Sequence, residues 1–398
     1  MTTSPKEILL VGLGAVGSIC AFCLKKGGLA RITVVARSSH ALVNDYGVHI
    51  KSRRYGEIIG WKPDRLCRSV SDAADQKYDY VIVTSKALPD LITTSTMLAP
   101  LLSSTYTKHF GQPIYALFQN GLKVEQDLYD ALVALGEQPN SKIISTSLYT
   151  MTNITTPGVV EHLSMADSIF LGIYRHGDFT TCVNSDEEMK ILAGLAAPLD
   201  SGGFQVQLVP EIQRKKLAKN LINVVFASTA TLTNYTVPAL FRPAPKRGST
   251  SYEPYLEPQT ASSINQYTIP VLRAMLLEVE ALARALGFPD TKDEFPSSLV
   301  DETIANQKRM HEDPRNTHVP SMLLDARKGQ PIEVEVIVGS IVIMARERGV
   351  PVPVSPDFAK SATLLNRPQR IETLYALLLV IQNQALGRKL SSPALQIS

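Results

Sequence analysis

Six residues near the start of the chain, Gly12-Leu13-Gly14-Ala15-Val16-Gly17, constrain its fold more than any other feature. They form a G-x-G-x-x-G motif that directly follows a strand-like run, residues 7–12, and opens a helix-like run that ends at Lys26. The first glycine permits the tight turn, the second lets a pyrophosphate approach the backbone, and the third lets helix and strand pack closely. The N–H groups at the helix start then point at the phosphates. This context predicts a dinucleotide-binding unit.

The residue that follows the second predicted strand, residues 31–36, selects the dinucleotide. An NAD site usually has Asp or Glu there, which bonds the ribose 2′-hydroxyl. This chain has Arg37, followed by Ser38 and Ser39. A carboxylate would repel a 2′-phosphate, whereas an arginine can hold it in a charge-assisted fork. The sequence therefore favours NADP(H); a solvated surface arginine is the alternative interpretation.

Strand-like and helix-like patterns alternate through the first half of the chain. This alternation is typical of an α/β fold with a parallel sheet covered on both faces, the Rossmann-type doubly wound arrangement. Further strands are predicted at 78–85, 113–119, 142–148, 158–163, 168–174 and 204–209, and helices at 88–102, 123–135 and 185–199.

After Pro210 the patterns become helical throughout. We therefore predict two domains, with residues 1–209 binding NADP and residues 210–398 forming an all-α substrate and catalytic domain. Residues 236–263 contain five prolines and little periodicity, and we expect them to form an exposed insertion between two helices. Apolar patterns at 331–345 and 371–381 would serve a homodimer interface as easily as a core.

Composition excludes several classes of protein. The 40 basic and 37 acidic side chains give a net charge of +3, too balanced for a protein that mainly binds nucleic acid. The 4 cysteines are too few and scattered for a disulfide framework, and with no secretory leader this predicts a cytoplasmic protein. The longest apolar runs fall short of the roughly 20 residues that span a bilayer, so no membrane partner is expected. Cys20 and Cys23 lack a second ligand pair, so no metal site is expected.

Two polar residues follow predicted strands. Asn120 comes directly after residues 113–119, and Lys86 comes directly after residues 78–85. The carboxyl ends of parallel strands are where α/β proteins place their ligands, so both are candidates for a ligand site. An Asn-Gly turn residue and a surface loop lysine are the alternatives.

The helix expected after Pro210 aligns three polar residues on one face. Lys216, Asn220 and Asn223 are spaced i, i+4 and i+7, beside an apolar stripe that must be buried. Asparagine is a poor residue for a helix interior, so this face is interpreted as the wall of a polar cleft.

A further segment, residues 320–335, places Pro331 in the first turn of a long helix and Glu333 near that helix's N-terminus. Stabilisation of the helix dipole is the alternative role for Glu333. Ser321, taken alone, is a candidate N-cap.

Taken together, these segments resemble the ketopantoate reductase (2-dehydropantoate 2-reductase) family. The resemblance rests on five segments in the family's order and spacing: GLGAVG (12–17), TSKA (84–87), QNGL (119–122), KLAKN (216–220) and SMLLDARKGQPIEVE (321–335). The family's activity implies NADPH-dependent reduction of ketopantoate, a small 2-oxo acid, to pantoate, in pantothenate biosynthesis.

The resemblance also implies roles for single residues. Lys216 matches the general acid that protonates the 2-oxo oxygen, and Glu333 the acid that contacts the substrate hydroxyl and orients that lysine. Asn220, Asn234 and Ser321 match substrate-binding positions. Arg37, Lys86 and Asn120 match cofactor-side residues.

The chain also departs from the family pattern. Val224 and His318 stand where the family commonly has asparagine, and the 236–263 insertion follows shortly after Val224. A reductase of another branched 2-oxo acid or ketone is therefore an alternative. A non-catalytic NADP-binding regulatory protein is a second alternative, although merely holding NADP would require neither Lys216 nor Glu333.

Overall fold

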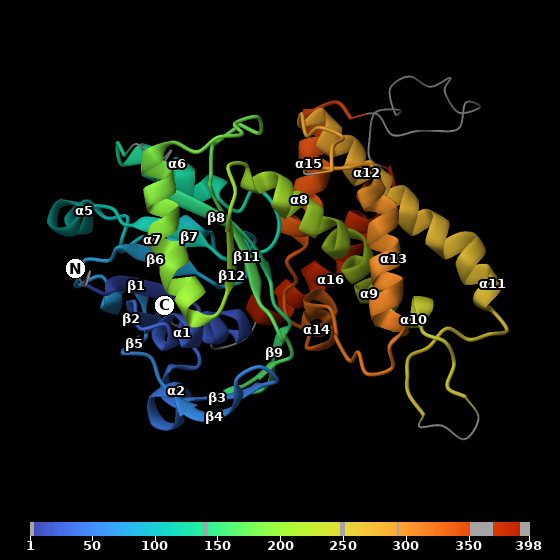
Figure 1. Ribbon diagram of the computed structural model, residues 1–398, viewed down its shortest axis with the longest axis horizontal. Helices are drawn as coiled ribbons and strands as arrows, with labels where there is room; N and C mark the ends of the chain where they lie inside the picture. Colours follow the sequence, from blue (N-terminus) through green and yellow to red (C-terminus); the bar gives the residue numbers. More distant parts are fainter. Residues whose placement is uncertain (1–3, 138–141, 247–250, 293, 351–368, 391–398) are drawn as a thin grey trace. The chain divides into compact units, whose positions relative to one another are not determined.

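The computed structural model describes residues 4–137, 142–246, 251–292, 294–350 and 369–390, and the chain forms two compact units, Met1–Lys216 and Leu217–Ser398. The first unit is α/β and the second is helical (Figure 1). The predicted change at 209–210 falls between the last strand, β12 (Gln205–Leu208), and the helix α8 (Ile212–Ile222). The first five residues of α8 still belong to the first unit. The assignment of cofactor and substrate to separate domains stays a prediction.

An eight-stranded sheet forms the centre of the first unit. Its strands lie in the order β12, β11, β8, β7, β6, β1, β2, β5, and every neighbouring pair is parallel except β8 with β11. The central strands are continuous apolar runs because both faces of the sheet are covered. The remaining bounds are β1 (Lys6–Val11), β2 (Ala30–Val35), β5 (Arg65–Cys67), β6 (Tyr80–Val83), β7 (Ile114–Leu117), β8 (Ile143–Tyr149) and β11 (Ser168–Ile173). The predicted doubly wound, largely parallel sheet is confirmed.

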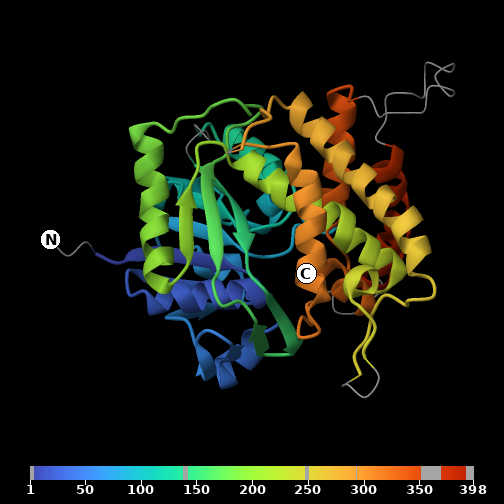
Figure 2. The same ribbon diagram turned by 45° about the vertical axis from the view of Figure 1, so that its right-hand side comes forward.

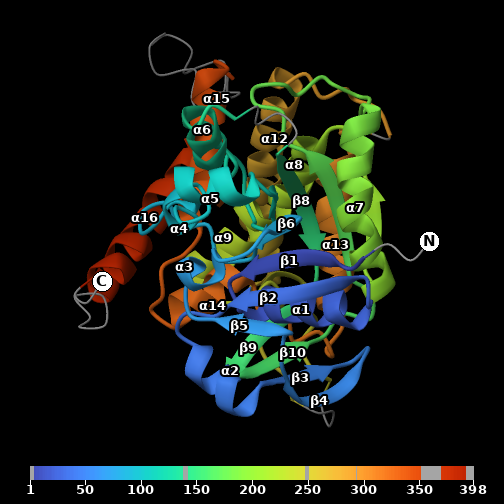
Figure 3. The same ribbon diagram turned by 90° about the vertical axis from the view of Figure 1, so that its left-hand side faces the viewer.

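Helices cover both faces of this sheet. Figure 3 shows α1 (Ala15–Lys26) and α7 (Asp186–Gly202) on one face, and α4 (Thr94–Met97), α5 (Ser104–Phe110) and α6 (Gln126–Ala134) on the other. Two shorter helices, α2 (His40–Tyr46) and α3 (Val70–Ala73), follow β2 and β5.

The predicted helix at 88–102 is wrong, because only the four residues of α4 are helical there. Pro89 and Pro100 bound the segment, and the Thr93 hydroxyl accepts a hydrogen bond from the Thr96 N–H at 3.2 Å. Prolines and short hydroxyl side chains favour such caps and turns over a continuous helix.

A second, four-stranded sheet in the first unit was mostly missed by the sequence analysis. Its order is β4-β3-β10-β9, and only β10 (Val159–His162) had been predicted, within residues 158–163. The other strands are β3 (Val48–Ser52), β4 (Gly56–Trp61) and β9 (Thr152–Thr156). They are rich in polar residues, so they lack the apolar runs on which strand prediction depends.

The second unit contains no strand among its described residues. Its elements beyond α8 are η2 (Asn223–Ala227), α9 (Ser228–Thr233), α10 (Pro238–Phe241), α11 (Ala261–Ser263), η3 (Ile264–Thr268), α12 (Ile269–Ala285), α13 (Ser298–Glu312), α14 (Ser321–Arg327), η4 (Glu335–Gly339), α15 (Ser340–Glu347) and α16 (Gln369–Leu390), where η marks a π-helical turn. Helix α12 packs against α13, α15 and α16, and Figure 2 shows α12 and α13 side by side. Among the described helices, none is both long and apolar enough to span a membrane.

The expectation of an exposed insertion at 236–263 is wrong for its first part. Pro238 begins α10, and Phe241 and Arg242 are buried. The Phe241 ring lies 6.3 Å from that of Phe226, and Arg242 donates to the carbonyl oxygens of Asp313 and Asn316. The guanidinium satisfies several backbone carbonyls at once, which anchors the segment despite its lack of periodicity.

Candidate active site

The turn between β1 and α1 has the geometry that its three glycines predict. Gly12 has a φ of +107°, which favours glycine. A Cβ on Gly17 would lie 2.0 Å from the Gly12 carbonyl oxygen, so helix and strand can approach this closely only with glycine there. A Cβ on Gly14 would meet no described atom within 4 Å. Open space therefore lies beside the backbone where α1 begins, as a pyrophosphate requires. Leu13, Ala15 and Val16 are half-buried in the same turn.

Three neighbouring parallel strands, β1, β6 and β7, bring their following loops to one edge of the sheet. The chain leaves β1 for β2 on one side and later returns to β6 on the other, which makes this edge a topological switch point, where such folds bind ligands. The Thr84 hydroxyl after β6 donates to the Gly12 carbonyl at 2.5 Å, and Gln119 Nε2 after β7 donates to the Ser85 carbonyl at 3.0 Å. These bonds tie the three loops together.

The predicted cofactor-side residues lie in these loops or beside them. Lys86 is exposed in the loop after β6, and Asn120 is half-buried after β7. Arg37 is exposed just beyond β2, in the turn that leads to α2. Their contacts with a nucleotide stay predictions.

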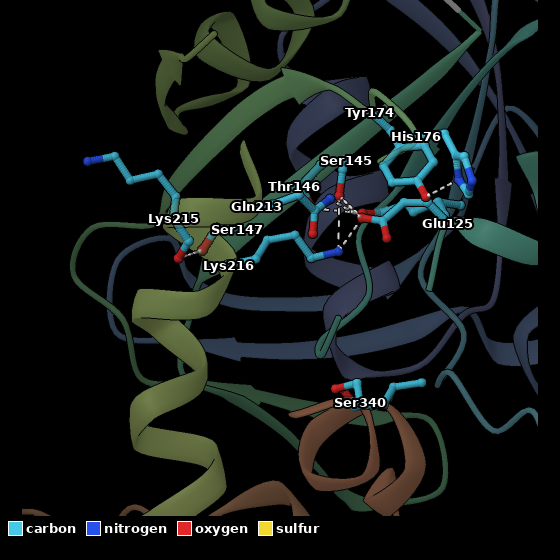
Figure 4. A network of polar contacts seen from close by, with 12 residues as sticks. Glu125, Ser145, Thr146, Ser147, Tyr174, His176, Gln213, Lys215, Lys216 and Ser340 are labelled. Carbon is cyan, nitrogen blue, oxygen red and sulfur yellow. Dashed lines mark hydrogen bonds and ion pairs between the residues drawn. The ribbon is translucent and has the colours of Figure 1, made fainter. Parts of the chain in front are cut away.

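Lys216 holds its ammonium in a buried polar cluster (Figure 4). Its Nζ donates to Glu125 Oε1, and to Ser145 Oγ at 3.0 Å. The Ser145 hydroxyl in turn donates to Glu125 Oε1, and Gln213 Nε2 donates to the same oxygen at 3.1 Å. Glu125 immediately precedes α6, Ser145 lies on β8, and Gln213 and Lys216 lie on α8. Three elements of the first unit therefore position this cluster.

The cluster is almost closed to solvent, since Lys216 is 4% exposed and Glu125 0%. Burial by itself would raise the pKa of the Glu125 carboxyl. The Lys216 charge and the hydrogen bonds from Lys216, Ser145 and Gln213 outweigh burial and hold that pKa below its ordinary value. Glu125 is therefore a carboxylate at neutral pH, and it forms an ion pair with the lysine beside it.

The adjacent lysine, Lys215, has different surroundings. Figure 4 shows the Lys215 side chain directed away from the cluster, and its Nζ lies 5.4 Å from the centre of the Phe170 ring. Of these two neighbouring lysines, Lys216 is the one whose amine lies in the buried cluster, and its catalytic role stays a prediction.

The second unit contains the remaining predicted site residues. Asn220 is 1% exposed, and its Nδ2 donates to the Ile337 carbonyl at 2.9 Å. Its Oδ1 is buried with no hydrogen-bond partner among the described residues, which leaves an acceptor for a ligand. Glu333 is also buried, and its carbonyl accepts from the Ile337 N–H at 3.1 Å.

Two local predictions about helix starts are wrong. The helical turn near Glu333 begins at Val334, so Pro331 lies outside it. The Ile332 N–H is bonded to Gln382 Oε1 at 2.7 Å instead. Ser321 is the exposed first residue of α14, and Pro320 takes the N-cap position.

Asn234 has a structural role in the second unit. It ends α9 in the left-handed conformation, with a φ of 59°. Arg327 Nε donates to its Oδ1 at 2.8 Å, and Arg327 Nη2 donates to its carbonyl at 2.6 Å. The substrate-binding roles of Asn220, Asn234 and Ser321 stay predictions.

Two family models match this chain. The model described as "Ketopantoate reductase PanE/ApbA" covers residues 8–176, and the model of the family's C-terminal domain covers residues 259–356. The chain belongs to the ketopantoate reductase family. The resemblance found in the sequence is thereby confirmed, and the family is one of oxidoreductases that act on 2-oxo acids.

Two curated proteins are similar to this chain over most of its length. An uncharacterized protein of Saccharomyces cerevisiae is 25% identical over 395 residues, which is 96% of this chain and 95% of that protein. A 2-dehydropantoate 2-reductase of Nostoc sp. is 24% identical over 349 residues, which is 87% of this chain and 91% of that protein.

Solved structures with different activities share the fold. A 2-dehydropantoate 2-reductase from Methylococcus capsulatus superposes with a TM-score of 0.66 at 22% identity, covering 95% of this chain and 97% of that one. A D-mandelate dehydrogenase, solved with NADH and anilino(oxo)acetate, also gives 0.66 at 17% identity, covering 95% and 99%. At these identities the likeness establishes the fold alone.

The sequence analysis missed Glu125, Ser145 and Gln213. Glu125 lies 91 residues before Lys216 and Ser145 lies 71 residues before it, so no local spacing links them. The one available signal was an acidic residue five positions after Asn120 at the start of a predicted helix. Helix-dipole stabilisation accounts for such a residue equally well.

Proposed function

We propose that this protein is an NADPH-dependent reductase that converts ketopantoate to pantoate, with Lys216 as the general acid. The observation that carries the proposal is the buried ammonium of Lys216, held by Glu125 and Ser145 within the dinucleotide-binding unit. Family membership supports the reaction class, and the 2-dehydropantoate 2-reductases among the relatives support the substrate.

The residues present suit a dinucleotide. The open space at Gly14 and the start of α1 would receive the pyrophosphate, and Arg37 would hold a 2′-phosphate. Lys86 and Asn120 would contact the nucleotide from the loops after β6 and β7. NADPH, when bound, supplies the hydride that reduces the carbonyl carbon.

Lys216 would supply the proton. Negative charge develops on the carbonyl oxygen as the ketone is reduced, so a fixed ammonium both stabilises that charge and can donate to it. In the second unit, we propose that Glu333 contacts the substrate hydroxyl and orients Lys216, and that Asn220, Asn234 and Ser321 bind the substrate. The unpartnered Asn220 Oδ1 supports a hydrogen bond from a ligand hydroxyl.

A second candidate is a reductase of a different branched or aryl 2-oxo acid. In a gap-free alignment, the fully buried Val224 stands where the family commonly has asparagine. A D-mandelate dehydrogenase has the same fold, so the fold accommodates other 2-oxo acids.

A substrate panel tests the proposal. Ketopantoate, straight, branched and aryl 2-oxo acids and simple ketones are each assayed by oxidation of NADPH and of NADH. Highest kcat/KM with ketopantoate and NADPH is expected; preference for another 2-oxo acid would favour the second candidate. If no compound in the panel oxidised either nucleotide, the reductase assignment would be rejected.

Two neighbouring lysines provide a matched pair for the proton donor. Lys216→Ala should lower kcat/KM by about 100-fold or more at neutral pH, the usual size of a general-acid contribution. Lys215→Ala removes the adjacent lysine, whose side chain points away, and should stay within about 3-fold of the parent. Equal effects of the two substitutions would remove Lys216 from the mechanism.

We further propose a cytoplasmic location and a role in pantothenate biosynthesis. A homodimer, suggested by the apolar patterns at 331–345 and 371–381, is likewise a proposal, which sedimentation of the purified protein would test.

A further inference from the structure

We propose that Glu125 is a positioning residue for catalysis: its carboxylate fixes the Lys216 ammonium in place and keeps it protonated between turnovers. The inference rests on the proposed role of Lys216 as proton donor. It assigns to the first unit a carboxylate partner that neither the family signature segments nor their spacing point to.

The contacts converge on one atom. Lys216 Nζ, Ser145 Oγ and Gln213 Nε2 all donate to Glu125 Oε1. Ser145 also accepts from Lys216 at 3.0 Å, so lysine, serine and carboxylate form a closed triangle. An ammonium has three N–H donors, and within the described residues two are directed into this triangle. The third N–H lies outside this triangle, and we propose that it donates to the carbonyl oxygen during the reaction.

Helices and a strand hold the triangle and the Gln213 amide that donates to it. Ser145 is fully buried on β8, and the Glu125 carbonyl accepts from the Tyr129 N–H at 3.0 Å at the start of α6. Gln213 lies at the start of α8, where its N–H donates to Glu211 Oε1 at 2.9 Å. A site on helix and strand ends holds a proton donor more tightly than a loop would.

The Lys216 charge acts directly on Glu125 and lowers the pKa of its carboxyl, and further titratable groups lie nearby. Tyr174, which follows β11, faces Glu125 (Figure 4), and burial together with the Glu125 charge raises the pKa of this phenol well above its usual range. Tyr174 is therefore neutral, and its hydroxyl lies 3.1 Å from His176 Nδ1. Asp130 is a further acidic group that acts on Tyr174.

This arrangement addresses a requirement of the reaction. Each turnover moves a proton from Lys216 Nζ to the carbonyl oxygen, and solvent must return one proton to the amine. The buried Glu125 carboxylate would then be left without its counter-charge, so it favours rapid return of that proton. Without Glu125, a buried amine would favour the neutral form, which cannot donate.

Glu125→Gln tests the charge while keeping the side-chain size. At pH 8 we expect kcat to fall by about 30-fold or more, with the alkaline limb of the pH–rate profile moved at least about one unit lower and partial recovery at lower pH. KM for the 2-oxo acid and the NADPH dissociation constant should stay within about 3-fold. Glu125→Asp keeps the charge but shortens its reach, so it should lower kcat without moving the limb.

Asp167→Asn is the matched control, because Asp167 is also a fully buried carboxylate of the first unit, but its Oδ1 lies 3.0 Å from His162 Nε2 rather than beside Lys216. It should leave kcat and the alkaline limb unchanged. A folded Glu125→Gln variant with the parent pH profile would overturn the inference. If that variant does not fold, Glu125→Asp decides instead. It keeps the negative charge, so an alkaline limb that moved to lower pH in this variant would also overturn the inference.

Chemical labelling separates this inference from the proposed function. Acetic anhydride modifies only neutral amines, and mass spectrometry compares Lys216 with Lys215 in the same protein sample across pH. In Glu125→Gln, labelling of Lys216 relative to Lys215 at pH 8 should rise by about 10-fold. An unchanged ratio would overturn the role of Glu125 even if the enzyme is active, whereas a parent protein that reduces no 2-oxo acid would overturn the proposed function alone.

Discussion

Alanine substitutions at two glycines of the turn between β1 and α1 should have different effects. One should lower the stability of the fold, and the other should weaken binding of the cofactor. A Cβ on Gly17 would lie 2.0 Å from the Gly12 carbonyl oxygen and 2.6 Å from Thr84 Oγ1, and real Cβ contacts are essentially never shorter than 3.0 Å. Relief requires α1 to move away from β1 by about 1 Å, and overpacking of this kind typically costs about 1–3 kcal/mol. Gly17→Ala should therefore destabilise the fold.

Gly14→Ala should instead leave the stability of the fold almost unchanged and weaken binding of the cofactor. Gly14 has a φ of −81°, which any residue adopts, and its Cβ would meet no described atom within 4 Å. Replacing an N-cap glycine by alanine costs at most about 1 kcal/mol. The new methyl group would occupy the space that a pyrophosphate needs. Losing one charge-assisted hydrogen bond, worth about 1.5–3 kcal/mol, would weaken NADPH binding by about 10- to 100-fold.

Thermal unfolding and nucleotide titration measure the two effects separately. Gly17→Ala should lower Tm by about 6–12 °C if the cost is near 3 kcal/mol, at about 2–4 °C for each kcal/mol in a unit of this size. Gly14→Ala should shift Tm by only a few degrees while NADPH affinity falls. The reasoning would be refuted if Gly14→Ala bound NADPH like the parent, or if Gly17→Ala kept the parent Tm.

Two further predictions concern single side chains. Arg37→Ala should weaken NADPH binding by about 10-fold or more and leave NADH binding almost unchanged, because only NADPH carries the 2′-phosphate; equal losses in the two titrations would reject that role. Burial raises the pKa of Glu211 to about 7, so the folded state binds this proton more tightly than the unfolded state, and stability falls as pH rises from about 4.5 through 7. Glu211→Gln removes this titration. Measured by urea unfolding, its effect on the free energy of unfolding should be more stabilising at pH 8 than at pH 5, by up to about 3 kcal/mol. Parallel curves of stability against pH for the variant and the parent would contradict this prediction.

The sequence predicted those parts of the fold that depend on local apolar patterns. Strand β6 and the last four residues of β1 are continuous apolar runs buried on both faces, and the G-x-G-x-x-G motif predicted the turn that follows β1. The second sheet was missed because its strand β4 is largely exposed and contains two glycines. Helix α13 lies within the region predicted to be all-α, but its bounds were not predicted, because its polar residues outnumber its apolar ones.

Prediction of the candidate site had a different limit. Lys216 could be singled out from its helical spacing and the family resemblance, but its carboxylate partner in the first unit could not. Glu125 and Ser145 reach Lys216 from α6 and β8, and only the order of strands in the sheet brings those elements beside α8. A pairing that depends on long-range topology leaves no periodicity or spacing in the sequence.

The π-helical turn η2 (Asn223–Ala227) has a consequence for how related chains can be aligned. A wide turn accommodates one residue more than an α-helical turn, so everything C-terminal to it is rotated by about 100° relative to a regular helix. Deleting one residue there would restore the regular helix and leave the direction of Lys216 untouched. Asn223 and Val224 lie in this turn. A relative whose asparagine is aligned with Val224 can therefore present that asparagine on the same helix face as Asn223 does here. One-residue insertions and deletions should therefore accumulate at this point of the family, and a gap-free alignment across it compares residues that are not spatial equivalents.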